Sequence, residues 1–451
     1  MLKIYNTLSH RIEEFSPLKP PDVGMYSCGP TVYDYQQIGN MRRYVGDDTL
    51  IRVLQYNGFQ VHHVMNITDV GHLVSDADTG EDKMEKGAKK FGKSVWDIAK
   101  MFEQQFKDSC QELNIQLPKE LMHATDFIKE QIALVQVLEK KGFTYKTADG
   151  IYFDTSKFPD YFKLSRQNPE ELRAGARIEM GEKKNVSDFA LWKFSPKEEK
   201  RQMEWESPWG MGFPGWHIEC SAMSMKALGD TFDIHTGGID HINIHHTNEI
   251  AQSEAVTDKP FVKYWVHHAF LQVEGEKMSK SLGNFYTVQD IIEKGYDPMA
   301  LRYLYLQTHY RQEMNFTFAA LEAAQNALNR LRREIVGWDD GSILIPEYEA
   351  QFKAAINDDL NMPNALAVLW EVVRSDKNSA EKLATVFKFD EVLGLSLKDA
   401  KSIVQKQGEV PSAVQKSLDE RENLRKEKKF AEADKIREKV IGMGYKVEDK
   451  S

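Results

Sequence analysis

Apolar and polar positions in the first 70 residues of the chain follow two different periods. Residues 22–33 and 59–68 are apolar runs with β-branched side chains and a turn signal at one end, which predicts two strands. Between them, residues 41–58 carry apolar side chains at helical spacing and end at a glycine, which predicts a helix with its stop signal. The order strand, turn, helix, strand favours a doubly wound parallel sheet.

A second α/β pattern lies further along the chain. Residues 231–240 predict a strand that runs into a glycine turn, residues 245–256 a helix, and residues 261–275 strand again. Before this block, residues 94–145 are predicted to be helical, and residues 146–205 form a charged segment that contains strand.

The remaining segments complete the expected organisation. Residues 75–93 are charged and punctuated by glycine, which predicts a surface excursion. From about residue 290 the pattern is helical, and residues 415–440 predict a highly charged helix. The expected fold is α/β, a Rossmann-type doubly wound parallel sheet split by a connective insertion and followed by an all-helical C-terminal region. We expect the first half of the sheet domain over residues 1–120 and the insertion over residues 121–205. The second half of the sheet domain would follow over residues 206–310, and the helical region over residues 311–451.

Composition adds that the chain is of an ordinary globular kind. Its 451 residues are too many for a single core, and 41% hydrophobic with 28% charged residues is typical of a soluble protein. The sequence lacks an apolar run of about 18 residues, which a membrane helix needs, and its start lacks the apolar core of a signal peptide. Cys28, Cys110 and Cys220 are too few for a disulfide framework, which favours a reducing cytoplasm.

The net charge of −10 argues against a surface coated with basic residues. Nucleic-acid binding needs only a local basic stripe, so it is not excluded. Two weak candidate clusters exist: Arg330, Arg332 and Arg333, and Arg425, Lys426, Lys428 and Lys429.

A glycine turn within residues 28–43, CGPTVYDYQQIGNMRR, is a candidate phosphate site. A strand that opens onto such a turn and a helix N-terminus presents unpaired N–H groups and the positive end of the helix dipole. Residues 275–285, GEKMSKSLGNF, add Lys277 and Lys280 in a glycine-bounded loop, and mobile lysines can follow charge that develops on phosphate. Each motif alone is weak, because a structural turn or a solvent-facing loop explains it equally well.

Four scattered side chains are candidate metal ligands. His245 and Glu249 are four residues apart in a predicted helix and share one face, while Cys28 and Cys220 each end an apolar segment. If the two halves of the sheet close on each other, the four could form a site of two sulfurs, one nitrogen and one oxygen, which suits zinc. No CxxC spacing supports this, and a solvated His–Glu pair with inert buried thiols is the plainer alternative.

The two loop motifs together resemble the two signature motifs of the class I aminoacyl-tRNA synthetases. More specific stretches resemble the cysteinyl-tRNA synthetase family over nearly the whole chain: residues 28–34 (CGPTVYD), 66–69 (NITD), 205–223 (WESPWGMGFPGWHIECSAM) and 235–250 (HTGGIDHINIHHTNEI). The resemblance implies ATP-dependent ligation of L-cysteine to tRNA(Cys) through a cysteinyl-adenylate, with one zinc ion per chain and Mg²⁺ bound with ATP. It also implies a cytoplasmic monomer that has no membrane partner.

The resemblance also implies roles for single residues. The zinc ligands would be Cys28, Cys220, His245 and Glu249, and the amino-acid pocket would contain Thr68, Trp216 and His235. ATP would be bound by Pro30, Thr31, Gly39, Asn40 and Lys280, and the catalytic residues would be Lys277, Lys280, Gln37 and Asn40. An apolar pocket separates near-isosteres such as cysteine and serine by only about 10- to 200-fold, whereas zinc prefers a thiolate to a hydroxyl.

Two features depart from the family's pattern. Its first signature motif usually has histidine at the position of Gln37 and often at that of Asn40; glutamine still offers N–H donors, so we expect activity to be retained. Residues 358–373 and 420–450 resemble the family's tRNA-contacting helices, but the sequence ends at Ser451, where relatives often carry a further Gly- and Trp-containing segment. We therefore expect altered reading of the anticodon.

Three other interpretations remain open from the sequence. A related cysteine ligase that joins activated cysteine to an amino-sugar carries no anticodon module, and the long tail over residues 318–451 argues against it. A non-catalytic tRNA-binding paralogue would have lost adenylation. A structural zinc protein would show no metal-dependent activation of cysteine.

Overall fold

The fold is described from a computed structural model of the chain. It describes residues 1–71, 83–119, 121–168, 182–196, 201–279, 283–408, 420–422, 424–425 and 429–442. The chain divides into two compact units, one made of Met1–Leu328 and Asp339–Ser396 and the other of Asn329–Trp338 and Leu397–Ser451.

A five-stranded sheet with the strand order β11-β10-β3-β4-β5 forms the centre of the larger unit. Its strands are β3 (Asp22–Ser27), β4 (Gln60–Ile67), β5 (Leu121–His123), β10 (Phe232–Gly238) and β11 (Val262–His268), and all neighbouring pairs are parallel. The strand order reverses between β3 and β10. The expected Rossmann-type doubly wound sheet is therefore confirmed.

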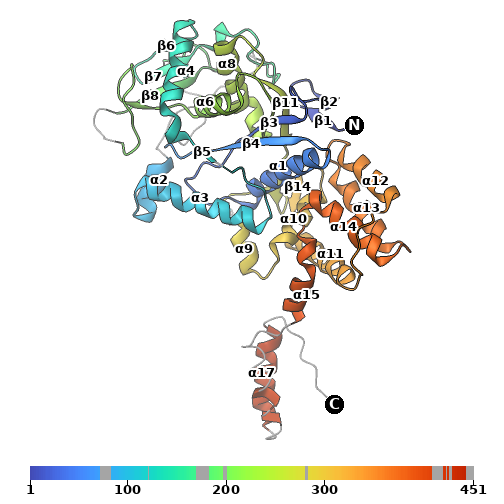
Figure 1. The fold of residues 1–451 in the computed structure, drawn as a ribbon. Helices are drawn as coiled ribbons and strands as arrows, with labels where there is room; N and C mark the ends of the chain where they lie inside the picture. The colour runs from blue at the N-terminus through green and yellow to red at the C-terminus, as the bar shows by residue number, and fades with distance from the viewer. Residues whose placement is uncertain are drawn as a thin grey trace. The chain divides into compact units, whose positions relative to one another are not determined.

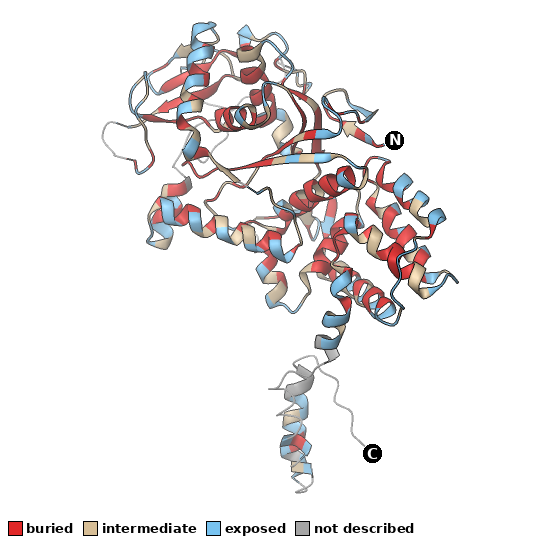
Figure 2. Ribbon diagram, in the orientation of Figure 1, coloured by how far each residue is buried: buried red, intermediate tan, exposed pale blue. Residues whose placement is uncertain are grey.

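Helices cover both faces of this sheet. Helix α1 (Ile38–Tyr56) connects β3 to β4, and α8 (His245–Thr257) connects β10 to β11 in the opposite direction along the sheet. Right-handed crossovers that run in opposite directions place their helices on opposite faces. Helix α1 contacts β4 and β10 on one face, and α6 (Trp216–Leu228) packs beside α8 on the other (Figure 1). Strands β10 and β11 are buried along nearly their whole length, whereas the first half of β4 is partly exposed (Figure 2).

An antiparallel four-stranded sheet lies between the two halves of the central sheet in sequence. Its strands are β6 (Thr144–Lys146), β7 (Gly150–Phe153), β8 (Phe189–Phe194) and β9 (Gly212–Pro214). Strand β8 has the sequence FALWKF and is almost fully buried, and helix α4 (Ile128–Lys140) shares its core. The domain boundaries given above stay predictions.

Short elements account for the differences from the expected secondary structure. The stretch 94–145 contains α3 (Val95–Glu112), the 3₁₀ turn Ala124–Phe127 and α4, but also strand β5, so the prediction of a wholly helical stretch is wrong. Residues 75–82 of the expected surface excursion lie outside the described residues, and most of its remaining part forms helix α2 (Lys83–Phe91).

The chain after residue 285 is mostly helical, as expected. The helices whose bounds the structure describes there are α9 (Val288–Glu293), α10 (Pro298–Leu306), α11 (Phe318–Val336), α12 (Pro346–Ile356), α13 (Met362–Arg374), α14 (Ser379–Leu393), α15 (Ala400–Gly408) and α17 (Phe430–Gly442). Strand β14 (Met314–Phe316) is an exception, because it pairs with β12 (Leu271–Val273), which in turn pairs with β13 (Glu276–Lys277). Lys429 is not helical, so the charged stretch 415–440 is not one continuous helix.

Candidate active site

The carboxyl ends of β3 and β10 meet where the strand order reverses, which is where doubly wound sheets bind ligands. Cys28 directly follows β3, and its backbone N–H donates to Thr236 O of β10 at 3.3 Å. The next residue, Gly29, lies so close to β4 that a Cβ atom would come within 1.5 Å of Asn66 O. Only glycine therefore lets the turn after Cys28 approach the neighbouring strand.

The structure brings the four candidate metal ligands together. Cys28 follows β3, Cys220 lies on α6, and His245 and Glu249 lie on the first two turns of α8. The ligand atoms of these side chains all lie within 4.8 Å of one another, and the side chains are buried. These residues form a buried group that could hold a metal ion.

The contacts of Glu249 fit a bound cation. Within the described part of the chain, Glu249 Oε1 accepts no hydrogen bond, although it lies 3.0 Å from His245 Nε2. A fully buried carboxylate oxygen normally has a hydrogen-bond partner. Two ligand atoms come this close without a hydrogen bond when both point at the same cation. The donor set therefore fits a metal.

Ion pairing governs the protonation of this group. Burial lowers the pKa of His245, but the Glu249 carboxylate beside it raises that pKa to about 10. Burial raises the pKa of Glu249, but His235 and His245 lower it to about 2. Burial raises the pKa of the Cys28 thiol. The hydrogen bond with Cys28 raises the pKa of the Cys220 thiol, and burial raises it further. A metal bound by the four must displace protons, so its binding weakens as the pH falls.

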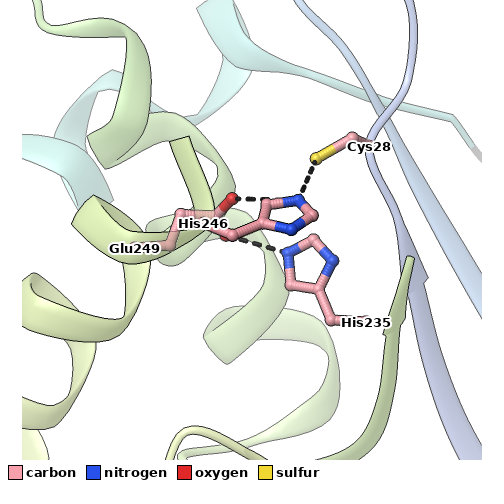
Figure 3. Close-up of side chains that lie close together, drawn as sticks. All are labelled: Cys28, His235, His246 and Glu249. Atoms are coloured by element: carbon pink, nitrogen blue, oxygen red, sulfur yellow. Dashed lines mark hydrogen bonds and ion pairs between the residues drawn. The ribbon is translucent and has the colours of Figure 1, made fainter. Parts of the chain in front are cut away.

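A second group overlaps the first and was missed in the sequence. Cys28, His235, His246 and Glu249 also have ligand atoms within 4.8 Å of one another, and their side chains point toward one another (Figure 3). His246 Nε2 lies 3.4 Å from Cys28 Sγ, and His235 Nε2 lies 2.9 Å from Glu249 Oε2. The signal in the sequence was the adjacent pair His245 and His246, of which only the first was considered. The first group contains two sulfurs and suits zinc better.

The two other expected pocket residues lie beside these groups. Thr68 directly follows β4 and is buried, and its Oγ1 donates to Glu219 Oε2 at 3.2 Å. The Trp216 ring lies 4.6 Å from the His245 ring, centroid to centroid, and is only partly buried. Trp216 therefore lies against a candidate metal ligand, whereas Thr68 contacts Glu219, the residue before Cys220.

The two signature motifs meet in space. Gln37 is the residue before α1 and forms a β-bridge with Thr287, while the N–H of Ile38 donates to Tyr286 O at 2.9 Å. A Cβ atom on Gly39 would lie 3.9 Å from Met278 Cε. The N-terminus of α1 therefore lies against the lysine loop.

The other residues of the two motifs are distributed as follows. Pro30 O accepts from the N–H of Thr68 at 3.0 Å, and Thr31 forms a β-bridge with Thr68. Asn40 is exposed on the first turn of α1, and Lys277 is exposed at the end of β13. Lys280 lies outside the described residues.

Two arginines that could have bound phosphate are buried in the fold. Arg42 is buried and donates to four backbone carbonyls, at Ala269, Phe270, His309 and Gln312, so it is not available to phosphate. Arg332 is fully buried, so the expected basic cluster there is wrong at this position. Lys426 and Lys428 of the second cluster lie outside the described residues.

Cys28, Cys110 and Cys220 are free thiols. Among the described residues, no helix combines the length and the apolar character needed to cross a membrane.

Comparison with known families matches both parts of the chain. A model described as the tRNA synthetases class I (C) catalytic domain matches residues 14–326, and one described as the DALR domain matches residues 351–398. The cysteine–tRNA ligase 1 of Burkholderia lata is 51% identical over 449 residues, covering 99% of this chain and 95% of the relative. The cysteine–tRNA ligase of Treponema denticola is 42% identical over 482 residues, covering 100% and 98%.

Solved structures share the fold at low identity. The methionyl-tRNA synthetase of Mycobacterium tuberculosis with methionyl-adenylate has a TM-score of 0.58 and 15% identity, covering 86% of this chain and 94% of that one. A LeuRS–tRNA–LeuAMS complex of Agrobacterium radiobacter has a TM-score of 0.60 and 12% identity, covering 88% and 86%. With a family model that matches most of its length and two relatives similar from end to end, the chain belongs to the cysteine–tRNA ligase family of the class I tRNA synthetases.

Proposed function

We propose that this protein ligates L-cysteine to tRNA(Cys) with ATP, through a cysteinyl-adenylate. The observation that carries the proposal is the buried group Cys28, Cys220, His245 and Glu249 at the carboxyl edge of the sheet in a member of this family. A site built from two thiols at that edge is suited to a substrate that itself carries a thiol. The same group is the basis for proposing one zinc ion per chain.

Cys28, Cys220, His245 and Glu249 would hold the zinc. When bound, zinc supplies a Lewis acid that prefers the substrate's thiolate to the hydroxyl of serine. The protein contributes rigidity, because His245 and Glu249 are fixed on one helix and Cys28 is fixed by its backbone hydrogen bond to β10. Thr68, Trp216 and His235 would line the pocket and orient the amino acid.

The N-terminus of α1 would bind the phosphates of ATP, which carries Mg²⁺. Its first N–H groups and helix dipole favour an anion, and Gln37 has no side-chain hydrogen bond that caps the helix. Pro30, Thr31, Gly39 and Asn40 would form the turn around ATP, with the amide of Gln37 as a donor. Lys277 and Lys280 would stabilise the charge that develops during transfer, which is mostly a matter of position and electrostatics.

In the second step, the terminal adenosine of tRNA would accept the cysteinyl group from the adenylate. The helical region over residues 311–451 would contact the tRNA, with Arg425, Lys426, Lys428 and Lys429 as candidate phosphate contacts. We also infer a monomer in the cytoplasm, where the free thiols Cys28 and Cys220 stay reduced.

ATP–pyrophosphate exchange tests this proposal. The assay compares cysteine with serine, before and after removal of zinc by a chelator. We expect exchange with cysteine and loss of that exchange without zinc. With serine we expect exchange to be lower by about 1,000-fold or more, a larger factor than a hydrophobic pocket alone provides. Equal exchange with both amino acids, or exchange that is independent of zinc, would contradict the proposal.

A further inference from the structure

The side chain of Arg43 holds the backbone of a candidate metal ligand. Arg43 Nη2 donates to Cys28 O at 2.6 Å, and the N–H of Cys28 donates to Thr236 O at 3.3 Å. A hydrogen bond from a charged donor is stronger than one between neutral groups, so the contact with Arg43 is the firmer of the two. The sulfur of Cys28 is joined to this backbone through Cβ alone. The position of the backbone therefore limits where the sulfur can lie.

Arg43 is in turn held by two buried side chains. Its Nη1 donates to Asp47 Oδ2 at 3.1 Å, one turn later on α1, and Asp47 Oδ1 lies 2.9 Å from Nε2 of His268 at the end of β11. The side chains of Arg43, Asp47 and His268 are 11%, 2% and 3% exposed. Fixing an arginine costs up to about 2 kcal/mol of side-chain entropy, which the contact with Asp47 offsets. The three side chains form a continuous chain of contacts from β11 to the backbone of Cys28.

A glycine in the middle of α1 provides the space for this chain of contacts. A Cβ atom on Gly46 would lie 2.4 Å from both Cε1 and Nδ1 of the His268 ring. The same ring contacts the ring of Tyr310 edge to face, with the centroids 5.3 Å apart. Glycine in the interior of a helix costs about 0.5–1 kcal/mol relative to alanine. The close approach of His268 to α1 explains why glycine is present there.

Arg43 also connects the candidate metal group to the candidate ATP site. It lies four residues after Gly39 on α1, so both residues lie on one face of the helix. The helix end that would bind the phosphates and the backbone of Cys28 are thus joined through a single side chain. Atoms that react with each other must lie within about 3–3.5 Å, so the two sites must keep a fixed separation.

We propose that Arg43 is a positioning residue that anchors Cys28 to helix α1 and thereby sets the place of its thiol among the metal ligands. Asp47 and His268 hold Arg43 in the direction that this contact needs. The inference rests on the proposed function, because it takes the four candidate ligands as a zinc site. It adds three residues, outside those four, on which zinc affinity depends.

The substitution Arg43→Met tests the anchor. Competition with a chromophoric chelator measures the Kd of zinc for the full chain. We expect Arg43→Met to weaken zinc binding by about tenfold or more, the usual loss when a group that orients a metal ligand is removed. Arg43→Lys keeps a cationic donor, so it should weaken zinc binding less than Arg43→Met does. In the chain loaded with Co²⁺, the thiolate-to-cobalt charge-transfer absorption should lose intensity in Arg43→Met.

Arg52→Met is the matched control. Arg52 lies on the same helix, is also buried, and pairs with Asp48, four residues away, at 2.7 Å. Its other hydrogen bonds go to Asn114 O at 2.7 Å and Glu391 O at 3.2 Å, away from the candidate ligands. We expect the melting temperature to fall in both variants. Zinc affinity should fall in Arg43→Met and stay within about twofold of the native value in Arg52→Met.

A double variant tests whether Asp47 acts through Arg43. Asp47→Asn removes the charge that holds the guanidinium, and alone it should weaken zinc binding by about threefold or more. In the Arg43→Met background the same substitution should add little, because the side chain that it orients is already absent. Additive losses would show that Asp47 does not act through Arg43.

The outcomes distinguish this inference from the proposed function. Equal zinc affinity of Arg43→Met and the native chain, or equal losses in Arg43→Met and Arg52→Met, would overturn the anchor while leaving the zinc site and cysteine ligation standing. Failure of the native chain to bind zinc would remove the proposed zinc site and this inference with it.

Discussion

Gly29 is the clearest case of a single residue on which the site depends. Its backbone packs so closely against Asn66 O that no side chain fits, and Asn66 Oδ1 accepts from the Gly29 N–H at 2.7 Å. The position of Cys28 follows directly from this contact. A glycine before proline is easily recognised as a turn in the sequence, but the partner strand that makes glycine necessary is visible only in the fold.

Gly29→Ala should destabilise the protein by about 3 kcal/mol or more, because the new methyl group would overlap backbone that cannot move freely. The midpoint of urea unfolding measures this. Gly24→Ala, on the strand β3 that leads to Gly29, is a matched control, because a Cβ there meets its nearest neighbour at an ordinary 3.5 Å. Equal midpoints for the two variants would contradict the argument.

His63 makes stability depend on pH. Burial lowers its pKa to about 4, whereas an unfolded histidine has a pKa of about 6.5. Between these values the unfolded chain binds more protons, so stability falls as the pH falls from about 6.5 to about 4, by at most about 3 kcal/mol. His63→Gln should flatten this part of the stability profile. A profile that His63→Gln leaves unchanged would count against this assignment.

Single residues also mark the limit of sequence reasoning. The spacing of His245 and Glu249 on one predicted helix face indicated a metal site only moderately, and the resemblance strengthened it, because no CxxC spacing links Cys28 and Cys220 to that helix. His246 was missed because only its neighbour His245, four residues before Glu249, was considered as a ligand. Arg42 carries the positive charge expected of a phosphate ligand. Only its four backbone carbonyl partners reveal that its role is structural.

Among the elements, helix α1 connects the candidate ATP site to the sheet. Its N-terminus lies against the lysine loop through Gly39 and Met278, and its body packs on the sheet. The strands and helix around it were predictable, since residues 22–33 and 59–68 are apolar runs with a turn signal, and residues 41–58 are rich in apolar residues and end at a glycine. Strands β5 and β14 were not predictable, because three residues are too few to carry a period.

Gln37 tests the chemistry of this helix end. We expect the native chain to catalyse ATP–pyrophosphate exchange with cysteine, and Gln37→His to stay within about tenfold of it, because both side chains offer an N–H donor. Gln37→Ala should be slower by about 100-fold or more, the usual loss when a donor to developing charge is removed. Exchange by the His variant alone, with an inactive native chain, would show that glutamine does not replace histidine.

At the scale of the whole molecule, buried Arg302 ties helices of the larger unit together. It donates to Leu393 O at the end of α14 at 2.8 Å, to Leu113 O after α3 at 2.8 Å, and to Asp48 Oδ2 of α1 at 2.5 Å. Arg302 is fully buried, so these contacts replace all of its hydration. The sequence showed only that the segment is helical; which helix ends meet at this side chain depends on the complete fold.

Arg302→Met should therefore destabilise the larger unit by about 3–5 kcal/mol, the usual cost of breaking a buried charge pair. Chemical unfolding followed by circular dichroism measures the shift, with Arg374→Met as the control at an exposed position of α13. We expect the control to change stability by less than about 0.5 kcal/mol. Similar midpoints for the two variants would show that the buried contacts contribute little.

The most direct test of the account is zinc K-edge X-ray absorption on the purified chain, with and without cysteine. Ligation by Cys28, Cys220, His245 and Glu249 predicts two sulfur and two nitrogen or oxygen neighbours around zinc, and a third sulfur when cysteine is added. A zinc ion without sulfur neighbours, or a sulfur count that cysteine leaves unchanged, would contradict it.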